Sequence, residues 1–166
     1  MAAKMKLGAV VALAVGLGVA ASGAVAHEHM GPMPKSAGAK AAYMRHQNFK
    51  AQGAAFKGVL DELKKDQPDK TVVAANAAKL KALTGQLPSW FPKGSGAESG
   101  FKTDAKPEVW SDPAGFAAAA NRLQVEASKL NQLAQAGDMT AVKGEVRAVG
   151  GACKNCHDKY RVPEKQ

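Results

Sequence analysis

The sequence has few aromatic residues, only two cysteines and no apolar run long enough to cross a bilayer. Its 166 residues include two tryptophans, two tyrosines and five phenylalanines. So few aromatic side chains fill little of a core, whereas the abundant alanine suits close helix packing and leaves room for a large prosthetic group. The longest apolar stretch, from Leu7 to Ala21, is shorter than the ~20 residues that a membrane-spanning helix needs.

The N-terminus has the three parts of a secretory signal peptide. Lys4 and Lys6 precede the apolar stretch, and Ala24-Val25-Ala26 places small residues where a signal peptidase cleaves. The sequence therefore predicts a signal peptide over residues 1–26 and export to the periplasm.

The charge is strongly positive but not concentrated. Removal of residues 1–26 takes away two lysines and no acidic residue, which lowers the formal net charge from +9 to +7. This charge favours encounters with acidic partners. Because the lysines are scattered among acidic residues, they do not form the basic stripe of a nucleic-acid-binding protein.

Residues 27–38 combine glycine, proline and polar residues without periodicity, which predicts a flexible segment ahead of the domain at 39–166. If cleavage follows Ala26, the mature chain begins His27-Glu28-His29. A free amine, two amides and a third-position imidazole can surround Cu²⁺ in a square plane. A tail without a metal role is the simpler interpretation.

The domain has a helical hydrophobic pattern and no strand pattern or internal repeat. Apolar residues at three- and four-residue steps predict helices over about 39–65, 69–87, 113–136 and 139–160. A long connection over 88–111 separates the second helix from the third. Short links elsewhere predict an all-α, antiparallel four-helix bundle with one long crossover.

Two of these helices have clear start signals. Asp112 offers a side-chain acceptor for free N–H groups, and Pro113 fits the first helical position. Asp138 is expected to cap the last helix after Gly137 has ended the third.

The main chemical motif is Cys153-Lys154-Asn155-Cys156-His157, the C-x-x-C-H pattern of covalent haem attachment. On a helix, residues three and four apart share a face. Both thiols can then add to the porphyrin vinyl groups while the His157 imidazole binds the iron as an axial ligand. The motif therefore predicts one covalent haem c.

Three alternatives use the same cysteines. They are a Cys153–Cys156 disulfide, a thioredoxin-like redox pair and a zinc site. Neither the disulfide nor the redox pair needs His157. A thioredoxin-like pair usually follows a strand, and here the preceding pattern is helical. A zinc site needs a fourth ligand, and no residue at a recognisable spacing could supply it.

The position of the motif in the last helix identifies a resemblance to cytochrome c′, the class II cytochrome c family. In common small electron-carrier cytochromes c, the motif lies near the N-terminus. The resemblance covers about 40–162 and implies a four-helix bundle, usually a homodimer formed through the first two helices. Further matching pieces are Tyr43-x-Arg45, Leu87-Pro88, Phe91-Pro92-x-Gly94-Ser95, the run from Ala105 to Asp112, and Cys156 to Arg161.

The resemblance also implies that Phe49, four residues after Arg45, faces the distal side of the haem. Low-spin relatives place a ligating methionine there. Phenylalanine has no lone pair to donate, so the iron is expected to be five-coordinate and high-spin. The alternatives are a plain core role for Phe49 and ligation by His46 or Met44, which lie on either side of Arg45.

Two arginines are further candidates. The resemblance implies that Arg161 lies beside the proximal face near the iron, and that Arg45 hydrogen-bonds a haem propionate. For each, the alternative is a solvated surface charge.

These expectations favour a redox-active protein that binds nitric oxide or carbon monoxide. Oxygen binding usually needs a distal hydrogen-bond donor, and Phe49 supplies none. No general acid, base or substrate pocket can be named, so an enzyme is not predicted. The alternatives are a low-spin carrier that exchanges electrons with a redox partner, and a metal-handling protein whose tail is the active part.

Overall fold

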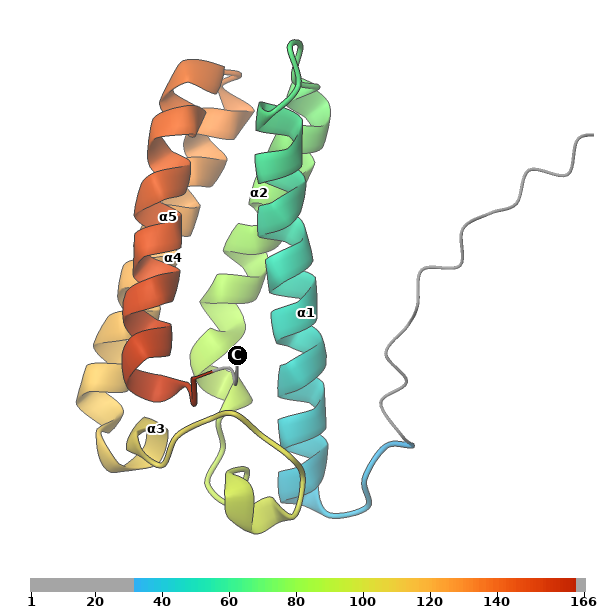
Figure 1. Cartoon of the computed structure of the whole chain (residues 1–166), viewed down its shortest axis with the longest axis vertical. Coiled ribbons are helices and arrows are strands. Elements are labelled where there is room, and N and C mark those ends of the chain that lie inside the picture. The colour runs from blue at the N-terminus through green and yellow to red at the C-terminus, as the bar shows by residue number, and fades with distance from the viewer. Residues whose placement is uncertain (1–31, 164–166) are drawn as a thin grey trace, which may run out of the picture. The chain divides into compact units, whose positions relative to one another are not determined.

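The computed structural model describes residues 32–163, in which four long helices lie antiparallel in a bundle (Figure 1). Within this range the only β pairing is an isolated bridge between Ala105 and Arg161. The predicted all-α four-helix bundle is confirmed. The helices are α1 (Ala37–Leu63), α2 (Lys70–Gln86), α4 (Pro113–Gln135) and α5 (Met139–Tyr160).

The long crossover between α2 and α4 contains three short helical turns. They are η1 (Leu87–Trp90), η2 (Ala97–Ser99) and the single turn α3 (Glu108–Ser111). The indole N–H of Trp110 donates to the carbonyl of Phe91 at 3.1 Å. This bond joins the two ends of the crossover, which lies at one end of the bundle (Figure 1).

Both predicted helix caps are present. A side-chain oxygen of Asp112 accepts from the Gly115 N–H at 3.0 Å, and one of Asp138 accepts from the Ala141 N–H at 2.9 Å. Each cap satisfies an N–H that has no partner within its helix.

The first helix begins earlier than predicted, at Ala37 rather than 39. The Ser36 hydroxyl accepts from the Ala39 N–H at 3.3 Å and caps the helix. Gly38 packs so closely on the crossover that a Cβ there would lie 2.0 Å from the Gly94 carbonyl oxygen. This contact stabilises a helical turn that composition alone assigned to a flexible tail.

The hydrophobic core is asymmetric. Helix α1 packs on α2, α2 on α4 and α4 on α5, whereas α1 and α5 make little direct contact. The facing sides of α1 and α5 are therefore not packed directly on each other. The core side chains that are at most 1 % exposed include Val59, Val73, Leu80, Leu130, Val142 and Val149.

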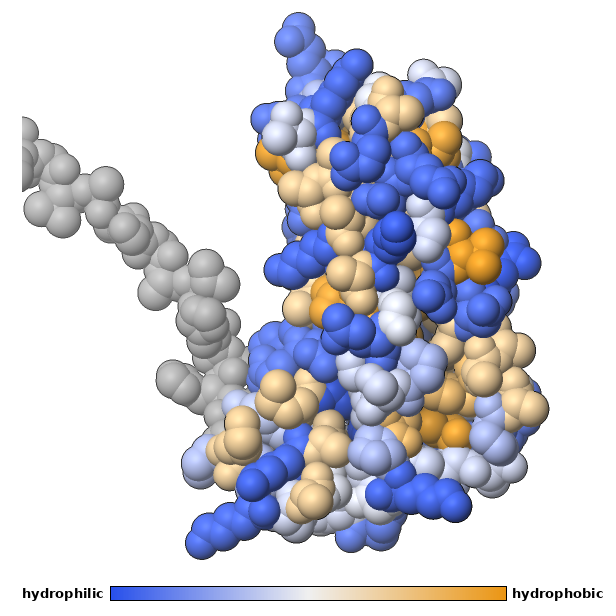
Figure 2. All heavy atoms as spheres, turned by 180° about the vertical axis from the view of Figure 1, so that it is seen from behind, coloured by the Kyte–Doolittle hydropathy of each residue, from blue (hydrophilic) through white to orange (hydrophobic). Residues whose placement is uncertain are grey.

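The face of the bundle opposite to that seen in Figure 1 is mostly polar. Seen from behind, hydrophilic residues cover most of the bundle, with small apolar patches between them (Figure 2). Between residues 32 and 163, none of the helices has the length and hydropathy needed to span a bilayer. The predicted signal peptide and the histidines of the copper hypothesis lie outside the described residues.

Candidate functional site

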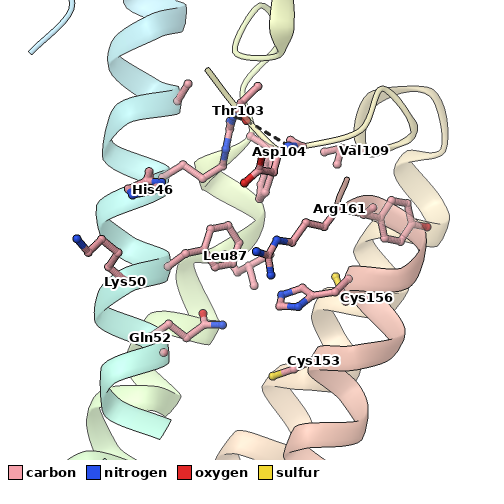
Figure 3. Close-up of a pocket in the computed structure, with 18 of the residues that line it drawn as sticks. His46, Lys50, Gln52, Leu87, Thr103, Asp104, Val109, Cys153, Cys156 and Arg161 are labelled. Atoms are coloured by element: carbon pink, nitrogen blue, oxygen red, sulfur yellow. Dashed lines mark hydrogen bonds between the residues drawn. The ribbon is translucent and has the colours of Figure 1, made fainter. Parts of the chain in front are cut away.

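A cavity of about 490 Å³ lies between α1 and α5 and is covered at one end by the crossover (Figure 3). Its volume is typical of pockets that hold small molecules and cofactors. The lining is mainly apolar and aromatic, with contributions from α2 and α4 at its back. All six predicted site residues line it, namely Arg45, Phe49, Cys153, Cys156, His157 and Arg161.

The C-x-x-C-H motif forms the wall on α5. Cys153 and Cys156 are both free thiols and half-buried, and they lie one helical turn apart on the cavity side. Burial raises the pKa of Cys156 to about 11 and also raises that of Cys153. Because a redox-active pair needs a readily formed thiolate, this environment disfavours the thioredoxin-like alternative.

The end of α5 is joined to the crossover by backbone hydrogen bonds. The Lys106 N–H donates to Tyr160 at 3.0 Å, and the Val162 N–H donates to Asp104 at 2.8 Å. Arg161 follows the last helical residue and has an extended backbone. Its side chain extends into the cavity (Figure 3). Arg161 is half-buried, and its position depends on the crossover rather than on helical spacing alone. Its expected place near the iron stays a prediction.

Phe49 lies on the opposite wall, on α1. Its ring makes edge-to-face contacts with Trp90 at 5.2 Å and Phe91 at 6.1 Å between centroids. Such contacts hold an aromatic side chain in a defined orientation. Phe49 therefore lines the cavity from α1 as a fixed aromatic side chain that cannot bind iron.

The two competing ligands differ in position. Met44 is 46 % exposed and does not line the cavity, so the structure argues against its ligation. His46 is exposed but contributes to the cavity edge.

Arg45 is only 3 % exposed, so the predicted surface alternative is wrong. Its guanidinium donates to the Trp90 carbonyl at 3.3 Å, to the Ser95 hydroxyl and carbonyl at 2.9 Å each, and to the Thr103 hydroxyl at 2.8 Å. Burial lowers its pKa to about 10. These bonds use the four terminal N–H donors and leave Nε–H, so the main observed role of Arg45 is to hold the crossover. Its bond to a propionate stays a prediction.

Sequence reasoning missed three polar residues of this region. Ser95 and Thr103 accept the Arg45 bonds, and no local pattern marks a partner that lies 50 or 58 residues away. Gln52 lines the cavity on α1. Its position three residues after Phe49 places it on the same helix face, and this spacing could have identified it.

The comparisons with known proteins bear directly on this site. A family model described as cytochrome c′ matches residues 40–161. The chain belongs to the cytochrome c′ family. A cytochrome c′ from Rubrivivax gelatinosus is 42 % identical over 93 residues, which are 56 % of this chain and 70 % of the relative.

Solved cytochrome c′ structures have the same fold. The crystal structure of cytochrome c′ from Rubrivivax gelatinosus superposes with a TM-score of 0.68 and 36 % identity, covering 74 % of this chain and 94 % of that one. A nitric oxide complex of a cytochrome c prime variant from Alcaligenes xylosoxidans gives a TM-score of 0.70 and 29 % identity, covering 79 % and 100 %.

The residues of this site fit the single covalent haem c of the family. Two free thiols one turn apart can form the thioether bonds, and the adjacent His157 supplies an imidazole for the iron. The cavity beside them is large and mainly apolar. When bound, the haem supplies an iron that exchanges one electron and accepts small ligands. Among residues 32–163, no group of three or more His, Cys, Asp or Glu side chains could hold a separate metal ion.

Proposed function

We propose that this cytochrome binds nitric oxide or carbon monoxide on a five-coordinate, high-spin haem with His157 as the only protein ligand of the iron. The observation that carries the proposal is that Phe49 lines the cavity from α1, because the family resemblance implies that low-spin relatives have their ligating methionine at this position. Nitric oxide and carbon monoxide bind iron without needing a strong hydrogen-bond donor, so an aromatic pocket suits them. A related cytochrome c prime variant, 29 % identical, was solved with nitric oxide bound.

The absorption spectrum of the purified ferrous protein tests this proposal. We expect a broad, unsplit visible band and a Soret band that shifts when carbon monoxide is added. Sharp, split visible bands that carbon monoxide does not change would refute an open coordination site.

The alternative is a low-spin electron carrier in which His46 binds the iron. The contribution of His46 to the cavity edge favours it. The exposure of the His46 side chain argues against this alternative, because an iron ligand must reach the centre of the cavity. Substitution His46→Ala separates the two proposals: the spectrum should stay unchanged if the site is open, and should become high-spin if His46 is the ligand.

We also propose that the protein acts in the periplasm, as a ligand-binding and electron-transfer protein rather than as an enzyme. Removal of residues 1–26 would leave a formal charge of +7. This charge favours an acidic redox partner or a small anionic donor. Reduction by a candidate donor should slow steeply as ionic strength rises, and a rate independent of salt would argue against electrostatic recognition.

The expected homodimer would form through α1 and α2. Val72 on α2 is 38 % exposed and lies among small alanine residues, which allow close approach of a second copy. Sedimentation velocity should detect the dimer, and substitution Val72→Glu should shift it toward monomer.

A further inference from the structure

Gly53 lies in the middle of α1, where a glycine destabilises a helix relative to alanine. Its backbone does not require glycine, because its φ is not positive. Packing does not require it either, since a Cβ at this position would meet no neighbouring side chain of the described residues within 4 Å. By contrast, a Cβ at Gly58 would lie 2.7 Å from the side chain of Asn76 on α2. Close packing therefore explains Gly58 but not Gly53.

The position of Gly53 is at the boundary between the cavity and the solvent. The residue lines the cavity and is also exposed. Phe49 precedes it by four residues and Phe56 follows it by three, so both are its neighbours on the surface of α1. Both phenylalanines also line the cavity. The missing side chain therefore leaves a gap at the edge of an aromatic wall.

Two lysines are the other neighbours of Gly53 on α1, and neither closes this gap. Lys50 points away from the cavity (Figure 3). Lys57 forms an ion pair with Asp61, one turn further along the helix. No atom of either lysine side chain lies within 4 Å of the position that a Cβ at residue 53 would take. The gap is therefore bordered by aromatic rings on its inner side and is open to the solvent.

We propose that Gly53 is a specificity-determining residue whose missing side chain forms an entrance for small uncharged ligands to the α1 side of the haem. This inference rests on the proposed function, because an entrance on this side has a role only if the iron has a vacant coordination position facing α1. A side chain at residue 53 would raise the barrier to passage without changing the free or the bound state. It should therefore slow entry and exit by the same factor and leave the affinity unchanged.

The test compares the wild-type holoprotein with its Gly53→Ala and Gly53→Leu variants. Gly144→Leu on α5 is the matched control: Gly144 is also exposed, a Cβ there also meets nothing within 4 Å, and it does not line the cavity. Stopped-flow mixing measures the association rate of carbon monoxide with the ferrous protein, and displacement by nitric oxide measures its dissociation rate. The C–O stretching frequency reports the surroundings of the bound ligand.

We expect Gly53→Leu to slow both association and dissociation about two- to tenfold, as expected if a side chain must leave its preferred rotamer for each ligand to pass. Gly53→Ala should have a smaller effect, because its methyl group fills less of the gap. The affinity and the C–O stretch should stay unchanged in both variants, and the control should match the wild type in every measurement.

Unchanged rates in Gly53→Leu would overturn the inference while leaving the proposed function intact. An altered affinity, C–O stretch or ferrous absorption spectrum would also overturn it, because residue 53 would then contact the haem or the bound ligand. A wild-type protein that does not bind carbon monoxide would instead refute the proposed function.

Discussion

The Arg45 side chain offers the sharpest test of how this site is held together. Its guanidinium joins α1 to the crossover at three residues, through the four bonds to Trp90, Ser95 and Thr103. Substitution Arg45→Leu removes every donor and leaves buried acceptors in the crossover. The expected result is a less stable protein whose crossover no longer covers the cavity firmly.

Two opposing contributions determine how much stability the Arg45→Leu substitution removes. Three of the bonds, at 2.8 to 2.9 Å, are short and charge-assisted, and each contributes about 2 kcal/mol. Against this, burial lowers the pKa of Arg45 from its usual value to about 10, which corresponds to a hydration cost of about 3 kcal/mol. The net loss on substitution is therefore about 3 kcal/mol.

Urea denaturation of the holoprotein, followed by far-ultraviolet circular dichroism, measures this loss. With a typical dependence of about 2 kcal/mol per molar urea, the midpoint should fall by roughly 1.5 M. Arg45→Lys should recover only part of the stability, because an ammonium group cannot reproduce a planar fork of donors. Arg147→Leu, at an exposed position on α5, is the control and should cost less than about 0.5 kcal/mol. A loss for Arg45→Leu no larger than that of the control would refute the reasoning.

Two further predictions concern the haem ligand and acid stability. Substitution Phe49→Met should produce a six-coordinate, low-spin spectrum and weaken carbon monoxide binding, because the gas must displace the thioether; an unchanged spectrum would show that residue 49 does not reach the iron. Hydrogen bonds, chiefly from Lys159 and then from the Gly115 N–H and the Tyr160 hydroxyl, lower the pKa of Asp112 to about 2. Its contribution to stability is therefore complete above about pH 4 and is lost as the pH falls toward 2. Asp112→Asn keeps a capping side chain and should flatten this part of the curve of urea midpoint against pH, whereas parallel curves for the two proteins would contradict the assignment.

The sequence predicted the parts of the structure that depend on local chemistry. The four long helices follow from hydrophobic periodicity, and Asp112 and Asp138 cap their helices because a capping side chain bonds an N–H three residues away. The haem motif could be placed on one helix face because its spacing matches the helical repeat. Local rules of this kind need no knowledge of the rest of the chain.

The remaining features depend on contacts between distant residues. The role of Arg45 was incompletely predicted because Trp90, Ser95 and Thr103 are brought to it only when the crossover folds back over the cavity. Arg161 was assigned to the cavity by resemblance, but the antiparallel bridge to Ala105 that holds it there has no sequence signal. The start of α1 was missed because its first turn is stabilised by contact with Gly94.

The crossover is attached to both walls of the cavity, α1 and α5. Arg45 fastens this segment to α1, and the bonds at Tyr160 and Val162 fasten it to the end of α5. Because α1 and α5 make little direct contact, the crossover loop rather than helix–helix packing sets the width of the cavity between them. Changes in the loop can therefore widen or narrow the entrance for small molecules without repacking the core beneath it.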